Sequence, residues 1–177
     1  MENEENQIMK KKIMLLALAL VMLVTPLFAI GGTSEDNSVG VGINFGNNTG
    51  VALRFGFGDF DVLANVGVSM FSLNSSGFGF GGDAAFNWNL YTIDGGRGLE
   101  FPLTIGAGLS TSVHFGDPTT FNLAVLFPFG IEYDFAQISD VPITVYFRLA
   151  PGFSLITVND LNVKFELGAY LGAIWTF

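Results

Sequence analysis

The sequence predicts an all-β fold, an eight-stranded antiparallel up-and-down β-barrel, and three observations support this prediction. Apolar residues alternate with small or polar ones through most of the chain after Ser38, which is the period of a β-strand. Clusters of Gly, Asn, Asp and Pro interrupt the alternation where hairpin turns are needed. Charged residues make up only 13 % of the 177 residues, and the chain contains 19 Phe and 23 Gly. Because soluble domains average about 25 % charged residues, this composition favours strands that face lipid.

The final stretch, residues 161–177, shows the alternation most clearly. Every second residue from Leu161 to Phe177 is apolar, and the residues between them are small, polar or charged except for Ile174. A strand with one continuous apolar face and one polar face suits lipid on one side and a polar interior on the other.

The other seven strands follow from the same alternation between turn clusters. In chain order they are expected at residues 39–45, 51–57, 62–70, 78–91, 101–115, 121–135 and 143–155. The fifth is the most regular, with Thr111 as the single polar residue in its apolar row, and Pro151 and Gly152 are expected to bend the seventh. Because no linker divides the chain, residues 39–177 are expected to form one domain.

The direction of the apolar face decides between two kinds of barrel. A soluble barrel of lipocalin type would turn this face inward, but an eight-stranded interior is just wide enough to be filled by side chains. The many Phe, Leu and Trp residues of the apolar face exceed that volume, whereas the Gly, Ala, Ser and Asn of the other face fit it. We therefore expect a transmembrane β-barrel with its apolar face in lipid. Its strands must close, because an open edge would leave backbone groups without partners in hydrocarbon.

Residues 1–29 are expected to be a secretory signal peptide that precedes the barrel. Three lysines at 10–12 are followed by an apolar stretch that ends at Ala29, which is the pattern of a basic region, a hydrophobic core and a small-residue cleavage site. Cleavage is expected after Ala29 or Gly31, and Met9 is a possible true start. An uncleaved membrane anchor is the alternative.

The expected topology assigns the two ends of the barrel. Residues 30–38 would be a flexible leader, and an even number of strands puts both termini on one side, by the usual rule the periplasm. The turns at 58–61, 92–98 and 136–141 would then be periplasmic, and those at 47–50, 72–77, 116–120 and 156–160 would face outside. Outward aromatic residues near both ends would form the two girdles of a membrane barrel: Phe78, Trp88, Phe101, Phe115, Tyr133, Phe135 and Trp175.

The last seven residues carry a family resemblance. Leu171-Gly-Ala-Ile-Trp-Thr-Phe177 resembles the C-terminal signal read by the outer-membrane barrel assembly machinery, with Gly172, Trp175 and Phe177 at the matching positions. In architecture the chain resembles the small barrels of the OmpX, OmpA-transmembrane and OmpW kind. Segments 101–108, 129–135 and 141–152 are similar to a family of small uncharacterised outer-membrane barrels, which often has Glu at the position of Arg148. The resemblance implies an outer-membrane location but no settled biochemical function.

Ionisable residues on the inward face are expected to form an interior charge network, because buried charges must be paired or hydrated. Its members are Arg54, Asp83, Glu132, Arg148, Lys164 and Glu166, and Asp134 lies on the same face. We favour a structural network that plugs the barrel. The alternative is a narrow channel for ions or small apolar solutes, in which Arg54 and Arg148 exchange carboxylate partners.

Enzymatic activity is not expected. Ser112 and His114 lie two residues apart on the inward face, and with a carboxylate such as Asp117 they would suggest a lipid-acting acyl hydrolase. However, no nucleophile motif surrounds Ser112. A single His and the absence of Cys predict no metal site and no cofactor. A net charge of −9 without a basic patch argues against nucleic acid as a partner.

The expected function is therefore that of a monomeric integral protein of the outer membrane, with a structural or surface-interaction role. Its partners would be membrane lipid and the barrel assembly machinery, and an extracellular protein ligand is a further candidate. The strands at 101–115 and 121–135 exceed the membrane thickness, so a sheet edge at their outer ends could pair with a foreign strand.

Overall fold

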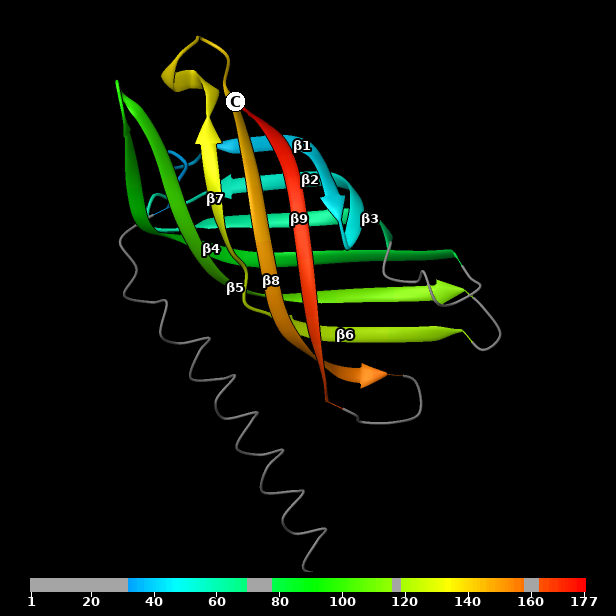
Figure 1. Ribbon diagram of the computed structural model, residues 1–177. Coiled ribbons are helices and arrows are strands. Elements are labelled where there is room, and N and C mark those ends of the chain that lie inside the picture. Colours follow the sequence, from blue (N-terminus) through cyan, green and yellow to red (C-terminus); the bar gives the residue numbers. More distant parts are fainter. Residues whose placement is uncertain (1–31, 70–77, 116–118, 158–162) are drawn as a thin grey trace, which may run out of the picture.

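The computed structural model describes residues 32–69, 78–115, 119–157 and 163–177. Within these ranges the chain forms one antiparallel sheet of nine strands, and a ring of hydrogen bonds runs through eight of them (Figure 1). Among the same residues, no helix is both long and apolar enough to cross a membrane. The expected signal peptide, residues 1–29, lies outside the described residues.

The strands lie close to the positions that the alternation predicts. They are β1 (Val39–Gly46), β2 (Asn48–Gly56), β3 (Asp61–Ser69), β4 (Phe78–Gly96), β5 (Leu99–Phe115), β6 (Thr120–Leu126), β7 (Phe129–Asp134), β8 (Ile143–Thr157) and β9 (Lys164–Thr176), with a short 3₁₀ helix, η3 (Phe135–Gln137), after β7. β4 and β5 extend further toward the turn that joins them than expected, and only Arg97 and Gly98 separate them. Both residues have positive φ, 59° and 81°, as a two-residue hairpin turn requires.

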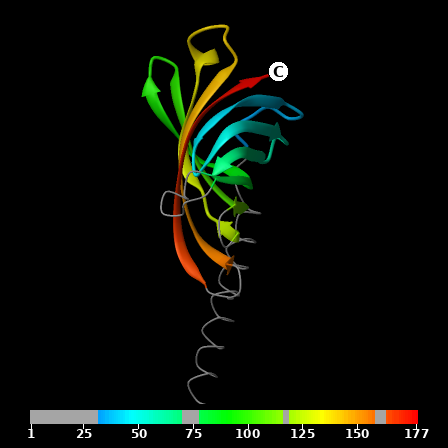
Figure 2. The same ribbon diagram turned by 90° about the vertical axis from the view of Figure 1, so that its right-hand side faces the viewer.

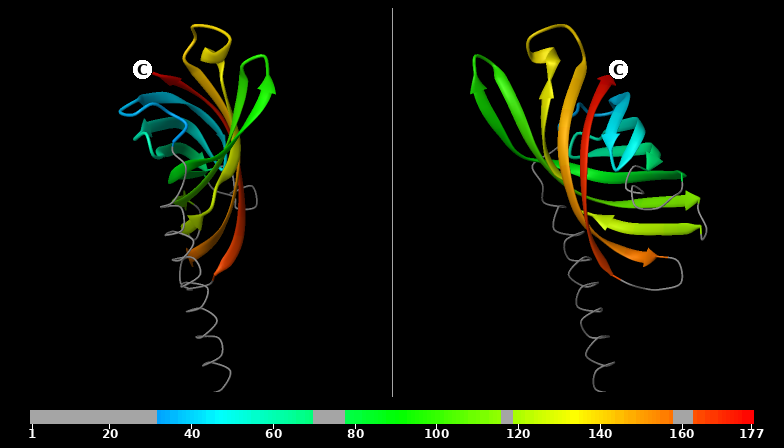
Figure 3. Two further views of the ribbon diagram at one scale, coloured as in Figure 1. Left: turned by 90° about the vertical axis from the view of Figure 1, so that its left-hand side faces the viewer. Right: turned by 45° about the vertical axis from the view of Figure 1, so that its right-hand side comes forward.

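The ring closes between the first and the last strand. β1 pairs with β2 on one side and with β9 on the other, and Gly40 lies opposite Thr176 in this register. From β9 the ring continues through β8, β6, β5, β4 and β3 back to β2. Figures 2 and 3 show the sheet curving around on itself, with the described ends of the chain at the same end of the ring. We call this end the terminal end.

The single strand expected at 121–135 is divided in the structure, and this expectation was wrong in detail. The break falls at Phe127 and Pro128, between β6 and β7. Proline has no N–H group and cannot donate to the ladder. Its carbonyl instead accepts a bond of 2.6 Å from Gly106 N, and Phe127 N donates to Pro151 O at 2.8 Å. Because β6 and β7 both lie between β5 and β8, the ring still passes through eight strands of the described chain.

The two faces of the ring differ as the volume argument predicts. Apolar side chains of the outward rows are exposed, for example Val66 at 67 % and Phe165 at 66 %, while the inward rows bury Asn, Ser, Thr, Arg and Glu. Ile174, the exception in the last strand, lies inside and is fully buried. It belongs to one cluster of buried residues with Leu63 and Leu126. The prediction that the apolar face points outward is confirmed.

Two hairpins extend beyond β1–β3 at the terminal end, β4–β5 and the β7–η3–β8 connection (Figure 1). The ladder between β5 and β7 covers only Leu103 to Ile105, and Pro102 immediately precedes it in the sequence of β5. Further out, Gln137 restores the connection, because its amide accepts from Glu100 N at 2.7 Å and donates to Glu100 O at 2.9 Å. One side chain therefore takes the place of a strand residue and ties the two hairpins together.

The interior is packed where a glycine leaves room for an aromatic ring. Tyr146 of β8 is 1 % exposed, and Gly172 lies opposite it on β9. A methyl group added at Gly172 would overlap the ring and hydroxyl of Tyr146. At this position the inward glycine accommodates a large side chain.

Gly172→Ala should therefore lower the free energy of unfolding, by about 1–3 kcal/mol, because overpacking forces ring and backbone to shift. Urea titration followed by tryptophan fluorescence measures this. In a Tyr146→Ala background the same change should cost almost nothing, and Ala169→Val on the exposed face of β9 is the control. Equal costs in both backgrounds would show that Gly172 does not serve this packing.

Candidate functional site

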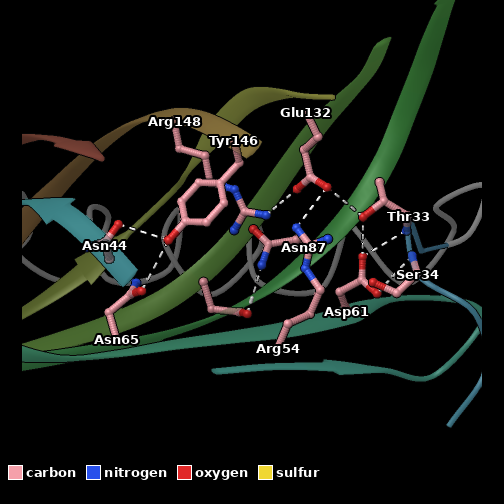
Figure 4. A network of polar contacts seen from close by, with 11 residues as sticks. Thr33, Ser34, Asn44, Arg54, Asp61, Asn65, Asn87, Glu132, Tyr146 and Arg148 are labelled. Atoms are coloured by element: carbon pink, nitrogen blue, oxygen red, sulfur yellow. Dashed lines mark hydrogen bonds and ion pairs between the residues drawn. The ribbon is translucent and has the colours of Figure 1, made fainter. Parts of the chain in front are cut away.

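The buried centre of the ring is the carboxylate of Glu132, held between two arginines (Figure 4). Arg54 Nη2 lies 2.8 Å from Glu132 Oε2, and Arg148 Nη2 lies 2.5 Å from Glu132 Oε1. The side chains of Arg54 and Glu132 are both 2 % exposed and that of Arg148 is 3 % exposed. Each carboxylate oxygen therefore has its own guanidinium partner, and these ion pairs compensate the buried negative charge in the absence of solvent contact.

Strand parity and ring closure together produce this arrangement. Glu132 lies between the outward residues of β7, and its neighbour in the register is Tyr146 of β8, two residues before Arg148. Arg148 therefore reaches Glu132 from the adjacent strand. Arg54 lies on β2, which is separated from β8 by β1 and β9, so its ion pair crosses the interior. The pair consequently joins strands that share no ladder.

The segment before β1 enters the same network. Thr33 Oγ1 lies 2.6 Å from Asp61 Oδ2 and 3.0 Å from Glu132 Oε2, so its hydroxyl is placed between two carboxylates. The backbone N–H groups of Thr33 and Ser34 also donate to Asp61, at 2.8 and 3.3 Å. Asp61 is fully buried. Residues 32–38, expected to be a flexible leader, thus make specific hydrogen bonds at the terminal end of the ring.

A second group of polar side chains continues the network away from the terminal end. The Tyr146 hydroxyl donates to Asn44 Oδ1 at 2.9 Å, and Arg148 lies over the Tyr146 ring at 5.0 Å from its centroid. Asp83 accepts from Asn48 Nδ2 at 2.8 Å and from Asn65 Nδ2 at 2.7 Å. The amide groups supply the donors that the carboxylate of Asp83 needs when no arginine contacts it.

The structure brings together three of the six expected network members and separates the others. Glu132, Arg54 and Arg148 are in direct contact, and Asp83 lies on the inner face with its own amide partners. Lys164 is exposed at the start of β9. Glu166 accepts a bond of 2.9 Å from Asn122, and the Ser154 hydroxyl bonds to the same asparagine.

Two cavities lie beside these groups. One of about 20 Å³ is lined by Asp83, Arg148, Tyr170 and apolar side chains, and it has room for water but not for a larger solute. The other, of about 290 Å³, lies at the terminal end between residues 33–38, Arg54 and the ends of β8 and β9. The ion pairs of Glu132 stand at the inner boundary of this hollow.

The pair considered for hydrolysis does not form a catalytic arrangement among the described residues. Ser112 is buried, and His114 Nε2 is buried without a hydrogen-bond partner, so no bond joins the two side chains. Asp117, the third member considered, lies outside the described residues. The described part of the chain also contains no group of three or more His, Asp or Glu residues that could hold a metal ion.

Several aromatic residues expected in the girdles make ring contacts toward the two ends of the strands. At the terminal end, Phe101 stacks on Tyr133 at 5.3 Å between ring centroids, and Tyr133 contacts Phe135 edge-on at 5.0 Å. Trp88 is only 9 % exposed, since Phe60 lies 6.5 Å from its ring. At the opposite end, Phe115 contacts Phe80 at 6.4 Å. Phe78 pairs with Phe115 in the ladder.

The residues of the expected assembly signal lie on the strand that closes the ring. Trp175 and Phe177 are exposed on the outer face, at 46 % and 79 %, and Gly172 faces Tyr146 inside. β9 pairs along one side with β1 and along the other with β8.

Comparison of the chain with protein-family models, with curated proteins and with solved structures finds no match. What supports the resemblance to small outer-membrane barrels is the antiparallel sheet with its ring of eight strands. The family assignment stays a prediction.

Sequence reasoning missed Thr33 and Asp61. Asp61 was assigned to a turn, although it stands two residues before Leu63 and four before Asn65 on the inward row of β3. Extending the alternation backward through the turn would have placed it inside. For Thr33 no signal exists in the sequence, because it precedes the first strand.

Glu132→Gln should lower the free energy of unfolding by about 3–5 kcal/mol, because it leaves two buried guanidinium groups without a counter-charge. Urea titration of the folded protein measures the change. Lys164→Gln removes a charge from an exposed residue and should stay within about 0.5 kcal/mol of wild type. Similar effects of the two changes would contradict a central role for Glu132.

Proposed function

We propose that this protein is an integral β-barrel of the outer membrane, with its interior closed by side chains and with a structural or surface-interaction role. The observation that carries the proposal is the inverted distribution of polarity. Exposed apolar residues occur on strands all around the ring, including Ile43, Val66, Leu109, Phe147 and Leu171, whereas Arg54 and Glu132 are buried. Such a surface has a favourable environment only in lipid.

The closed ring supports the same proposal. In hydrocarbon every backbone N–H and C=O group needs a partner, and a ladder that returns from β9 to β1 supplies one for each strand. Aromatic pairs toward the two ends of the strands, Phe80 with Phe115 and Phe101 with Tyr133, also support the proposal, because membrane barrels carry aromatic girdles at both interfaces.

A plugged interior is favoured over a channel by the contacts of Glu132. Its ion pair to Arg54 crosses the ring, its ion pair to Arg148 joins the adjacent strand, and the cavity next to Arg148 has a volume of only about 20 Å³. A conducting path would require these side chains to separate, at the cost of exposing charges that are now paired. An acyl hydrolase is not favoured, since Ser112 and His114 are not hydrogen-bonded to each other.

Leu109→Lys should destabilise the protein refolded into lipid vesicles by about 2–4 kcal/mol, the cost of a cation near the middle of a bilayer. Leu109 is 54 % exposed in the outward row of β5. Ile138→Lys, at a 63 % exposed position beyond η3, is the matched control and should cost little. In a soluble protein both changes would be nearly neutral, so a small effect at Leu109 would refute the membrane proposal.

In planar bilayers the folded protein should be electrically silent, provided that a heat-dependent gel shift confirms folding beforehand. Single-channel recording gives the measurement, and Arg148→Ala is the informative variant because it removes one of the two ion pairs. Regular conductance steps in the wild type, altered in selectivity by Arg148→Ala, would favour the channel instead.

A further inference from the structure

One edge of the sheet is left open at the terminal end. β3 begins at Asp61, which pairs with Asn87, so the ladder between β3 and β4 stops there. β4 continues to Gly96 and pairs with β5 over this length. On the other side, no described residue forms a backbone hydrogen bond to the segment 89–96, which we call the β4 edge. Figure 1 shows this part of β4 rising away from β3.

The β4 edge lacks several of the features that usually prevent strand addition, although its ladder with β5 is irregular between Asn89 and Tyr91 and between Asp94 and Gly96. Proline, lysine and inward charges protect natural edges, but residues 89–96 contain neither proline nor lysine and have one charged residue, Asp94. Leu90 and Tyr91 are 56 % and 64 % exposed, and Ile93 is 39 % exposed. An added strand would gain backbone hydrogen bonds together with contacts to these side chains.

The charge around the β4 edge selects the kind of strand that fits. Outside the buried network, the carboxylates of the described terminal end are Glu35, Asp36, Asp59, Asp94, Glu100, Asp134 and Asp140, and Arg97 is the only exposed basic residue there. All of these carboxylates except Asp134, which is half-buried, are exposed. A basic segment would be attracted and an acidic one repelled.

At the opposite end of the ring, the ladder between β1 and β9 stops at Gly46 and Tyr170, so residues 164–168 of β9 are also open on one side, and Lys164 protects that edge. The outer part of β5 pairs with β4 up to Phe115 and with β6 up to His114. β6 pairs in turn with β8 up to Asn122. Within the described residues, β5 has partners on both sides up to His114 and β6 up to Asn122, so the free edge expected at the outer ends of strands 101–115 and 121–135 is not seen there.

We propose that the β4 edge is a docking site for an extended basic segment of another protein, which adds to the sheet as a further strand beside β4. The hydrogen bonds come from the backbone of residues 89–96, and the surrounding carboxylates give the preference for Lys and Arg. The proposal does not depend on the function proposed above, since the edge is open whatever surrounds the outer face.

The test uses the full chain folded in an uncharged detergent and a fluorescent eight-residue peptide of alternating Lys and Val. Anisotropy should show saturable binding that weakens with salt, while a peptide of alternating Glu and Val should not bind. Amide hydrogen exchange should slow at residues 89–96 in the complex and stay unchanged on β1. Protection elsewhere, or equal binding of the acidic peptide, would overturn the proposal.

A matched pair of variants separates the edge from general charge effects. Tyr91→Lys places a cation on the β4 edge and should weaken binding at least about tenfold, since lysine is a natural edge protector. Ile138→Lys adds the same charge at a position of nearly equal exposure, 63 % against 64 %, on the other hairpin. It should change binding less than about threefold, the range of one exposed charge pair. Equal losses would mean that charge alone attracts the peptide, with no strand added.

Should both peptides fail to bind, the remaining question is whether the chain's own residues cover the edge. Hydrogen exchange of the unliganded protein decides this directly, because an open edge exchanges fast and a covered one slowly. Slow exchange at 89–96 without peptide would refute the proposal, as would fast exchange that no basic peptide changes.

Discussion

The pairing of one buried carboxylate with two guanidinium groups is the interaction on which the interior depends. An eight-stranded ring has little internal volume, so side chains that meet at its centre must fit one another in shape and in charge. Glu132 receives Arg148 from the neighbouring strand and Arg54 from across the ring. The alternating Gly and Asn of the inward rows follow from this, because small side chains leave the space that two arginines and Tyr146 occupy.

Strand parity allowed the sequence to predict which residues face inward and approximately where the strands lie. Parity repeats every two residues and needs no knowledge of distant contacts. It could not predict that Arg54, rather than Lys164, meets Glu132, because that choice depends on how the strands are staggered around the closed ring. Thr33 was missed for a related reason: its partners, Asp61 and Glu132, lie far away in the sequence.

Two departures from a regular ring occur at prolines, in addition to the register shifts in the β4–β5 and β6–β8 ladders. Pro128 separates β6 from β7, and Pro102 stands where the ladder between β5 and β7 stops. In both places other hydrogen bonds keep the neighbouring segments connected: Gly106 N donates to the carbonyl of Pro128, and the amide of Gln137 bonds to Glu100 beyond Pro102. Alternation in the sequence continues through Pro128, which explains why one strand was expected where two exist.

Closure between β1 and β9 also has a kinetic meaning. These strands lie at opposite ends of the described chain, yet they are hydrogen-bonded from Gly40–Thr176 to Gly46–Tyr170. Contacts of such high sequence separation cost the most loop entropy and generally form late in folding. The ring therefore cannot close before the last strand has been synthesised, and until then the open edges of β1 and of the unfinished sheet are exposed to wrong partners. A chain of this topology needs either a fast final step or assistance that shields those edges until β9 arrives.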